Sequence, residues 1–424
     1  MVVVERPLDW RDPLAVAAGL AHRDGALALL SDGGPHGRWS WIGADPDQVR
    51  VGDVDDASPF AALARFGPGT VGLASYDSGA RPATGPRKAV WPDLMLARYP
   101  ALLRFDLHQR TLAAIGRGAT REAAAAAADE AGRWREARVP APGAPADTFH
   151  EEAEGRAYRA AVADVVGRIA AGELFQANIA RAWSGRLKPD ADPFDVFLRL
   201  QAGRASAYGA FWRLGDRALV SNSPELFLDF DGRRIETRPI KGTRPRGGDA
   251  TEDAALAAEL LASAKDRAEN LMIVDLMRND LARAARPGSV RVERLFEIES
   301  LPTVHHLVST VIAEAARGVG PGQVLRAAFP PGSITGAPKH QAMKVIAAHE
   351  PPRGPWCGSL FLLGEQGALT ASVLIRTAAF EHDGEGWRFR TLAGAGIVAD
   401  SDPAAELAET EVKISALRQA LTGA

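Results

Sequence analysis

Cysteine is almost absent from this sequence: Cys357 is the single cysteine among 424 residues. A chain with one cysteine forms no internal disulfide, so we expect a protein of a reducing compartment, the cytoplasm. The sequence also lacks any apolar run of the ~18 residues that a membrane span requires. Its first residues lack the basic and apolar segments of a signal peptide, and we therefore expect no association with membranes.

Neither sign of charge is in excess, because 50 basic and 53 acidic side chains leave a formal net charge of −3. This balance argues against binding to nucleic acid or to a membrane surface. Hydrophobic residues make up 46% of the chain, which is enough for a large core without disulfides.

The chain divides at a stretch rich in proline, alanine and glycine. We interpret residues 1–140 as an N-terminal β-rich region, 141–152 as a linker and 153–424 as a second, larger region. Strand-like and helical runs alternate irregularly along both parts. This pattern favours an α+β fold, a complex α/β sandwich, over a simple doubly wound sheet, and we expect the two regions to share one intertwined core.

Periodicity predicts several local elements. Apolar residues at helical spacing predict a helix from about residue 155, and residues 251–285 are predicted to be helical. The pair Asp231-Gly232 between two strand-like runs predicts a hairpin. Residues 369–381 are expected to form one strand that contains Arg376. The chain is expected to close with a helix capped by Ser401 or Asp402.

Motifs for several common chemistries are missing. The segment "GAGIVA" (394–399) fits G-x-G-x-x-A, but too few residues follow it for a dinucleotide-binding unit. Its glycines are better suited to present backbone amides to a carboxylate. No zinc spacing and no serine elbow occur. Cys357 follows proline and tryptophan rather than glycine, so it is interpreted as a small buried thiol, and the chain is not expected to hydrolyse glutamine.

Charged residues in apolar surroundings leave two interpretations open. Arg376 could form a structural ion pair or could hold a substrate carboxylate. Glu406, Glu409 and Lys413 share one face of the last helix, and together with Glu269 they could hold Mg²⁺. Spacing alone favours the alternative, a solvated helix face with an i,i+4 ion pair.

Lys241 lies within "ETRPIKGTRPRG", among Arg238, Arg244 and Arg246. It is either a solvated surface charge or a nucleophile whose amine is kept neutral. Three nearby cations would lower the pKa of a lysine, provided that the site is partly dry.

Long segments resemble the chorismate-utilising enzymes and occur in the order found in that family. They are "SPELFL", "TRPIKGTRPRG", "DRAENLMIVDLMRNDLAR", "VHHLVST", "FPPGSITGAPK", "IRT", "GAGIVADSDP" and "ETEVK", between about Tyr158 and Leu417. The resemblance implies the fold of anthranilate synthase component I, in which two antiparallel-rich sheets pack together with helices outside. It also implies that residues 153–424 form the chorismate-binding catalytic region.

Two positions indicate a branch of this family. Isochorismate and salicylate synthases have a lysine base where this chain has Gln176, and anthranilate synthases usually have alanine where it has Lys241. The resemblance therefore implies the aminating branch that makes 4-amino-4-deoxychorismate, for p-aminobenzoate and folate, from chorismate and ammonia. The alternatives are the anthranilate-forming branch and a chorismate-binding subunit without catalysis.

The resemblance also implies the role of each site residue. Glu225 is expected to protonate the departing C4 hydroxyl, and Lys241 to attack C2. Glu269 and Glu409 are expected to bind Mg²⁺, with Glu406 acting through water. Ammonia is expected from a separate glutamine amidotransferase subunit. The residues expected to contact chorismate are Thr243, His306, Thr335, Arg376, Gly394, Ala395, Gly396 and Lys413.

Overall fold

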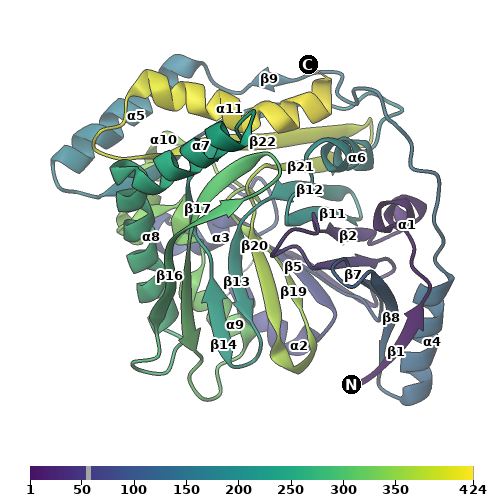
Figure 1. Cartoon of the computed structure of the whole chain (residues 1–424). Coiled ribbons are helices and arrows are strands. Elements are labelled where there is room, and N and C mark those ends of the chain that lie inside the picture. The colour runs from purple at the N-terminus through teal and green to yellow at the C-terminus, as the bar shows by residue number, and fades with distance from the viewer. Residues whose placement is uncertain (54–58, 424) are drawn as a thin grey trace.

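Two antiparallel β-sheets pack together and helices cover the outside (Figure 1). The structure is a computed structural model that describes residues 1–53 and 59–423. One sheet has 12 strands and the other has 10. The predicted α+β sandwich is therefore confirmed. Within the described residues, no helix has both the length and the apolar character needed to cross a membrane.

The 12-stranded sheet mixes strands from the beginning, middle and end of the chain. In spatial order its strands are β1 (Val2–Leu8), β8 (Thr111–Gly118), β7 (Ala101–Asp106), β3 (Trp39–Gly43), β2 (Leu27–Leu30), β11 (Tyr208–Leu214), β12 (Arg217–Ser223), β21 (Thr377–His382), β22 (Trp387–Ile397), β10 (Gln176–Arg186) and β18 (Gly336–Ala337), with β9 (His150–Glu151) also paired to β10.

The 10-stranded sheet is mixed in the same way. Its strands are β15 (Ile240–Pro245), β17 (Val304–Glu314), β14 (Arg234–Thr237), β13 (Leu226–Phe230), β20 (Leu369–Val373), β19 (Ser359–Leu363), β5 (Thr70–Ala74), β6 (Leu94–Arg98) and β4 (Gln48–Gly52), with β16 (Arg291–Ser300) also paired to β17.

Helices α5, α7, α10 and α11 gather along one end of the molecule, at the top of Figure 1. The α-helices are α1 (Pro13–Leu20), α2 (Leu63–Phe66), α3 (Tyr76–Thr84), α4 (Arg121–Arg133), α5 (Gly155–Ala170), α6 (Pro193–Arg204), α7 (Ala250–Ala262), α8 (Ala264–Ala282), α9 (Pro321–Ala328), α10 (Lys339–His349) and α11 (Pro403–Thr422). Asp402 caps α11 as predicted, since its side chain accepts from the amides of Ala404 and Ala405.

The two predicted regions do not form separate sheets. Strand β2 pairs with β11, and β5 pairs with β19, so residues 1–140 supply strands to both sheets. A buried cluster between the sheets joins Leu27 and Leu73 from the first region to Trp212 and Leu360 from the second. The chain therefore builds one intertwined core, and the predicted linker ends in β9 on the outside of that core.

Two local predictions have different outcomes. The hairpin at Asp231-Gly232 is present as β13 and β14, and Gly232 has φ 95°, which suits a glycine turn. The prediction of a single strand over 369–381 is wrong. The chain forms β20 in one sheet and β21 in the other, and it crosses between the sheets at Arg376, whose φ is 51°. An apolar run cannot reveal this crossing, because both strands are buried.

Gly116 offers a test of how closely α4 packs on β8. A Cβ atom at Gly116 would lie 1.9 Å from the Ala124 carbonyl oxygen and 2.3 Å from the Ala128 nitrogen, both backbone atoms. We expect Gly116→Ala to lower the free energy of unfolding by about 1–3 kcal/mol. The matched control is Gly132→Ala on α4, where the nearest atom is 3.8 Å away. Urea titration should show no loss of stability for the control; equal losses would contradict this packing.

Candidate active site

The side chains predicted to do chemistry come from the 10-stranded sheet and two helices. Glu225 directly precedes β13 and Lys241 lies in β15. Glu269 belongs to α8, and Glu409 and Lys413 belong to α11. The charges of Glu225, Glu269, Glu409 and Lys413 all act on the Lys241 amine, so the fold brings these five groups together.

The amine of Lys241 lies against the glycines of β22. A Cβ atom at Gly396 would be 3.3 Å from Lys241 Nζ and 3.0 Å from Gln176 Nε2. Burial lowers the pKa of Lys241 from its ordinary value, the Glu269 carboxylate opposes that shift, and Lys413 adds to it. The neutral amine that a nucleophile requires is therefore favoured.

The three arginines beside Lys241 in the sequence are not the cause of its lowered pKa, so that interpretation is wrong. Arg246 forms a two-bond ion pair with Asp253 at 2.6 and 2.7 Å. Arg244 pairs with Glu259 and Asp266, and Arg238 pairs with Glu299. Each arginine is neutralised by its own carboxylate, and the cation that acts on the lysine is Lys413, 172 residues further along the chain (413 − 241).

Glu225 has the surroundings of a general acid. Its residue is 5% exposed, and burial raises the pKa of its carboxyl group to about 7. A hydrogen bond with the Ser333 side chain and the charge of Lys241 oppose this shift. A carboxyl group with a pKa near 7 can hold a proton at neutral pH and release it during a reaction.

Two amides of β22 are free to bind an anion. Gly396 faces Asn178 and Gly394 faces Ala180 in the ladder, but the amides of Asn178 and Ala180 point away to Thr335 and Glu350. The two cross-strand pairs, Asn178 with Gly396 and Ala180 with Gly394, are therefore non-hydrogen-bonded pairs of the ladder. In such pairs the amides of Gly394 and Gly396 point away from β10. Pairing of β22 with β21 ends at Thr391, so no strand within the described residues takes these amides on the other side.

Ala395 differs from the two glycines around it. By the same alternation its amide is directed toward Ile179 in the ladder. Its side chain is 0% exposed and packs in the cluster beneath α5 and α10. The expectation that Ala395 contacts the substrate is therefore not supported by its position.

The predicted metal ligands lie near one another, with Glu409 held by Lys413. Lys413 Nζ is 2.6 Å from Glu409 and 2.9 Å from the Gly394 carbonyl oxygen. Burial would raise the pKa of Glu409, but this pairing lowers it below its ordinary value. Burial raises the pKa values of Glu269 and Glu406.

Within residues 1–53 and 59–423, no cluster of three or more His, Cys, Asp or Glu side chains has the arrangement to hold a metal ion. Glu406 accepts from the Ser401 hydroxyl at 2.7 Å instead. Two carboxylates remain, Glu269 and Glu409, whose charges act on each other. They fit Mg²⁺, which commonly binds one or two protein carboxylates and completes its shell with water and substrate.

His306 and Arg376 form a second part of the site. Burial and the charge of Arg376 lower the pKa of His306 to about 4, so the imidazole is neutral at pH 7. Its Nδ1 lies 2.9 Å from the Thr243 hydroxyl, and its buried Nε2 has no partner among the described residues. The left-handed backbone of Arg376 is a strained conformation of the kind that occurs at functional sites.

Thr335 is placed beside the site, but its hydroxyl is occupied. It is 0% exposed and donates to the Pro331 carbonyl oxygen at 2.8 Å, while its own carbonyl accepts from Asn178. Its role in this structure is to join the "GSITGAP" loop to β10.

Sequence reasoning overlooked Asn178 and treated Gln176 only as a sign of the branch. Both are buried, and the Gln176 amide and the Asn178 side-chain oxygen have no hydrogen-bond partner within the described residues. Amide side chains at the alternate positions 176 and 178, next to apolar residues of the same strand, are the signal that could have identified them, because burying an unpaired amide is costly.

The comparison with known proteins agrees with this geometry. The family of chorismate binding enzymes matches residues 42–419, and the chain belongs to that family.

Relatives come from two branches of that family. The aminodeoxychorismate synthase component 1 of Salmonella typhimurium is 38% identical over 358 residues, which are 82% of this chain and 76% of that protein. The anthranilate synthase component 1 of Thermus thermophilus is 38% identical over 379 residues, 86% of this chain and 79% of that protein. The crystal structure of anthranilate synthase component I from Streptococcus pneumoniae superposes with a TM-score of 0.77 at 26% identity, covering 90% of this chain and 92% of that one.

The raised pKa of Glu225 predicts a pH-dependent loss of stability. The native state favours the protonated carboxyl group, so its contribution is present below pH about 4.5 and is lost as pH rises through about 7. Glu225→Gln should not show this loss. The free energy of unfolding of the variant, relative to that of the unchanged chain, should therefore rise by up to about 3 kcal/mol as the pH increases from about 4.5 to about 7. The control is Glu154→Gln, at a side chain that is 75% exposed. Urea titrations at several pH values measure both free energies. If the difference between the variant and the unchanged chain does not grow with pH, a buried, protonated Glu225 is contradicted.

Proposed function

We propose that this chain is the chorismate-aminating component of an aminodeoxychorismate synthase, which converts chorismate and ammonia to 4-amino-4-deoxychorismate and water for p-aminobenzoate and folate synthesis. The observation that carries the proposal is the buried amine of Lys241 beside Gly396, with Glu225 acting on it.

Chorismate carries two carboxylates, and the site offers groups to receive them. The amides of Gly394 and Gly396 face away from β10, and Arg376 and Lys413 supply positive charge. Amides and cations arranged in advance bind carboxylates without leaving buried charge unpaired. Neutral His306, whose Nε2 has no partner among the described residues, would contact a neutral part of the substrate.

The reaction divides into two displacements. The Lys241 amine attacks C2, both ring double bonds shift (C1=C2 to C1=C6, and C5=C6 to C4=C5), and the C4–O bond breaks while Glu225 gives its proton to the leaving oxygen, which departs as water. Ammonia then attacks C4, both double bonds shift back, and the N–C2 bond breaks to restore the lysine. The proton lost by the new amine returns to Glu225, whose raised pKa lets it act in both directions.

Glu269 and Glu409 are the residues that would hold Mg²⁺. When bound, Mg²⁺ supplies positive charge that offsets the ring carboxylate of chorismate. Lys413 would then be released from Glu409, to which it is paired in this structure, and could turn to the substrate.

The chain has no means of releasing ammonia from glutamine through a cysteine nucleophile. Cys357, its single cysteine, is 0% exposed, and burial raises the pKa of its thiol. A reactive cysteine has the opposite character, with partial exposure and a lowered pKa. We therefore propose that a separate glutamine amidotransferase subunit supplies ammonia.

Anthranilate synthesis is the second candidate, because relatives with that name are as similar as the aminodeoxychorismate relatives. Both activities need the same substrate, and the difference between them lies at Lys241. Isochorismate formation is a weaker candidate, since the fully buried Gln176 amide cannot serve as a base to activate water.

Identification of the product tests the proposal most directly. The purified chain, given chorismate, Mg²⁺ and an ammonium salt, is expected to make 4-amino-4-deoxychorismate, and chelation of Mg²⁺ should stop the reaction. Chromatography with mass detection separates this product from anthranilate and isochorismate. Anthranilate as the main product would replace the proposal by the second candidate, and binding of chorismate without turnover would identify a non-catalytic subunit.

Replacement of Lys241 tests the covalent step. Lys241→Ala should lower the rate of amination by about tenfold or more, because the attacking amine is lost. Intact-protein mass spectrometry of the unchanged chain with chorismate and no ammonia should show an adduct that Lys241→Ala lacks. Lys188→Ala is the control, since the Lys188 side chain donates to the Ala144 carbonyl oxygen at the surface. An adduct that persists in Lys241→Ala would refute the lysine as nucleophile.

A further inference from the structure

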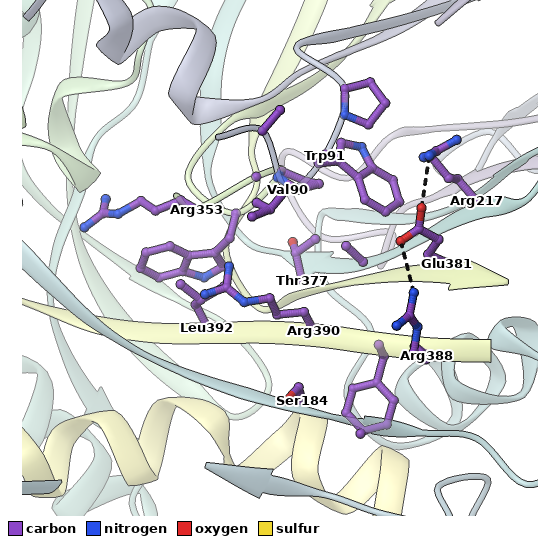
Figure 2. Close-up of a pocket in the computed structure, with 18 of the residues that line it drawn as sticks. Val90, Trp91, Ser184, Arg217, Arg353, Thr377, Glu381, Arg388, Arg390 and Leu392 are labelled. Carbon is purple, nitrogen blue, oxygen red and sulfur yellow. Dashed lines mark hydrogen bonds and ion pairs between the residues drawn. The ribbon is translucent and has the colours of Figure 1, made fainter. Parts of the chain in front are cut away.

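Arg353 is a buried cation that the proposed reaction does not use. Its side chain is 1% exposed and pairs with Glu350, whose side chain is 4% exposed. Figure 2 shows Arg353 at one side of a cavity of about 1000 Å³, extending away from the ion-paired group of Arg217, Glu381 and Arg388 at the other side. A charge this deeply buried needs several partners, so the contacts of Arg353 indicate what it holds in place.

Four hydrogen bonds fix the Arg353 guanidinium. Two go to the Glu350 carboxylate, at 2.8 and 2.9 Å. The other two go to main-chain carbonyl oxygens, of Asn178 at 2.6 Å and of Ile334 at 3.3 Å. Burial would lower the pKa of Arg353, but the Glu350 carboxylate raises it above its ordinary value, so the group stays charged. A planar cation with these bonds is held in one orientation.

The ion pair binds β10 opposite the two glycines of β22 that present free amides. Asn178, whose carbonyl oxygen the arginine takes, faces Gly396 in the ladder. Ala180, whose amide donates to the glutamate at 2.7 Å, faces Gly394. The pair therefore takes up the outward-directed groups of β10 as a neighbouring strand would, and so fixes where β10 lies against the glycines.

An aromatic ring links the guanidinium to Gly394. The Arg353 Cζ atom is 5.0 Å from the centre of the Trp356 ring and 4.6 Å from the centre of the Tyr76 ring. The Trp356 ring also reaches β22, since a Cβ atom at Gly394 would be 3.0 Å from Trp356 Cη2. Close-packed interiors transmit displacements, so a shift of the guanidinium would move the ring against Gly394.

The hydrogen bonds of the ion pair all lead to the 12-stranded sheet. Strands β10 and β22 belong to it, and Ile334 lies just before β18 of the same sheet. The groups that react are on the other sheet, because Lys241 lies in β15 and Glu225 directly precedes β13. A change that acts through Arg353 should therefore disturb the amides that receive the substrate and leave the reacting groups in place.

We propose that Arg353 is a positioning residue for substrate binding: with Glu350 it holds β10 and Trp356 against β22, so that the two free amides of β22 meet a carboxylate of chorismate. This inference rests on the proposed function. Arg353 acts through these neighbours, because its own donors are taken by the Glu350 carboxylate and the two carbonyl oxygens.

Arg353→Lys tests this role, because lysine keeps the charge beside Glu350 but has no planar fork to bind two carbonyl oxygens or to lie flat between two rings. With ammonium salt, the KM for chorismate is expected to rise by about tenfold while kcat stays within about threefold. Calorimetry measures binding without turnover: Arg353→Lys/Lys241→Ala should bind chorismate more weakly than Lys241→Ala by the same factor.

Arg117→Lys is the matched control. Arg117 in β8 is also a buried arginine with a carboxylate partner, Glu365, at 2.7 Å. Urea titration should show that both lysine variants lose stability, whereas the control should keep its KM for chorismate within about twofold of the unchanged chain.

Two variants of Tyr76 decide the matter if Arg353→Lys does not fold. Tyr76→Leu removes one of the rings beside the guanidinium and leaves the ion pair intact, so it should weaken chorismate binding by about threefold or more. Tyr76→Phe keeps the ring and is its control.

The outcomes of these tests are distinct. A loss of kcat with an unchanged KM, or equal changes of KM in Arg117→Lys, would overturn the positioning role of Arg353; so would equal chorismate binding by the two Tyr76 variants. If the unchanged chain binds chorismate but makes no aminated product, the proposed function fails, while the binding constants still decide the role of Arg353. No binding of chorismate at all would overturn both.

Discussion

One buried ion pair, between Glu350 and Arg353, holds the parts of the active site in place. Both side chains are almost fully buried, and Arg353 also donates to the carbonyl oxygens of Asn178 and Ile334, while Glu350 accepts from the Ala180 amide. The guanidinium lies between the rings of Tyr76 and Trp356, at 4.6 and 5.0 Å. Loss of one partner would leave a buried charge unpaired, which typically costs about 3–5 kcal/mol.

That arrangement explains why the amides of Gly394 and Gly396 remain available. Glu350 and Thr335 take the amides of Ala180 and Asn178, so β10 faces the two glycines without bonding to them. The same alternation places Gln176 and Asn178 toward Lys241. The electrostatic balance at this amine follows from the fold as well: burial favours its neutral form, three carboxylates oppose this effect, and Lys413 supports it.

Much of the fold could be predicted from the sequence, because its strongest signals are local. The hairpin at Asp231-Gly232 and the cap at Asp402 depend on neighbouring residues, and both are present. The crossing at Arg376 could not be predicted, since the residues on each side are equally apolar. The effect of the three arginines on the pKa of Lys241 could not be predicted either. Proximity in sequence does not show which carboxylate each arginine pairs with in the fold.

The early end of pairing along β22 has a consequence for how the substrate is received. An unpaired strand edge usually attracts another strand, and proteins commonly protect such edges. Here the open edge lies inside the molecule, beyond Thr391, where no strand of the described part of the chain pairs with β22 on that side. A carboxylate that accepts from Gly394 and Gly396 would complete the sheet as a missing neighbour would, so chorismate would act as the last hydrogen-bonded member of the fold.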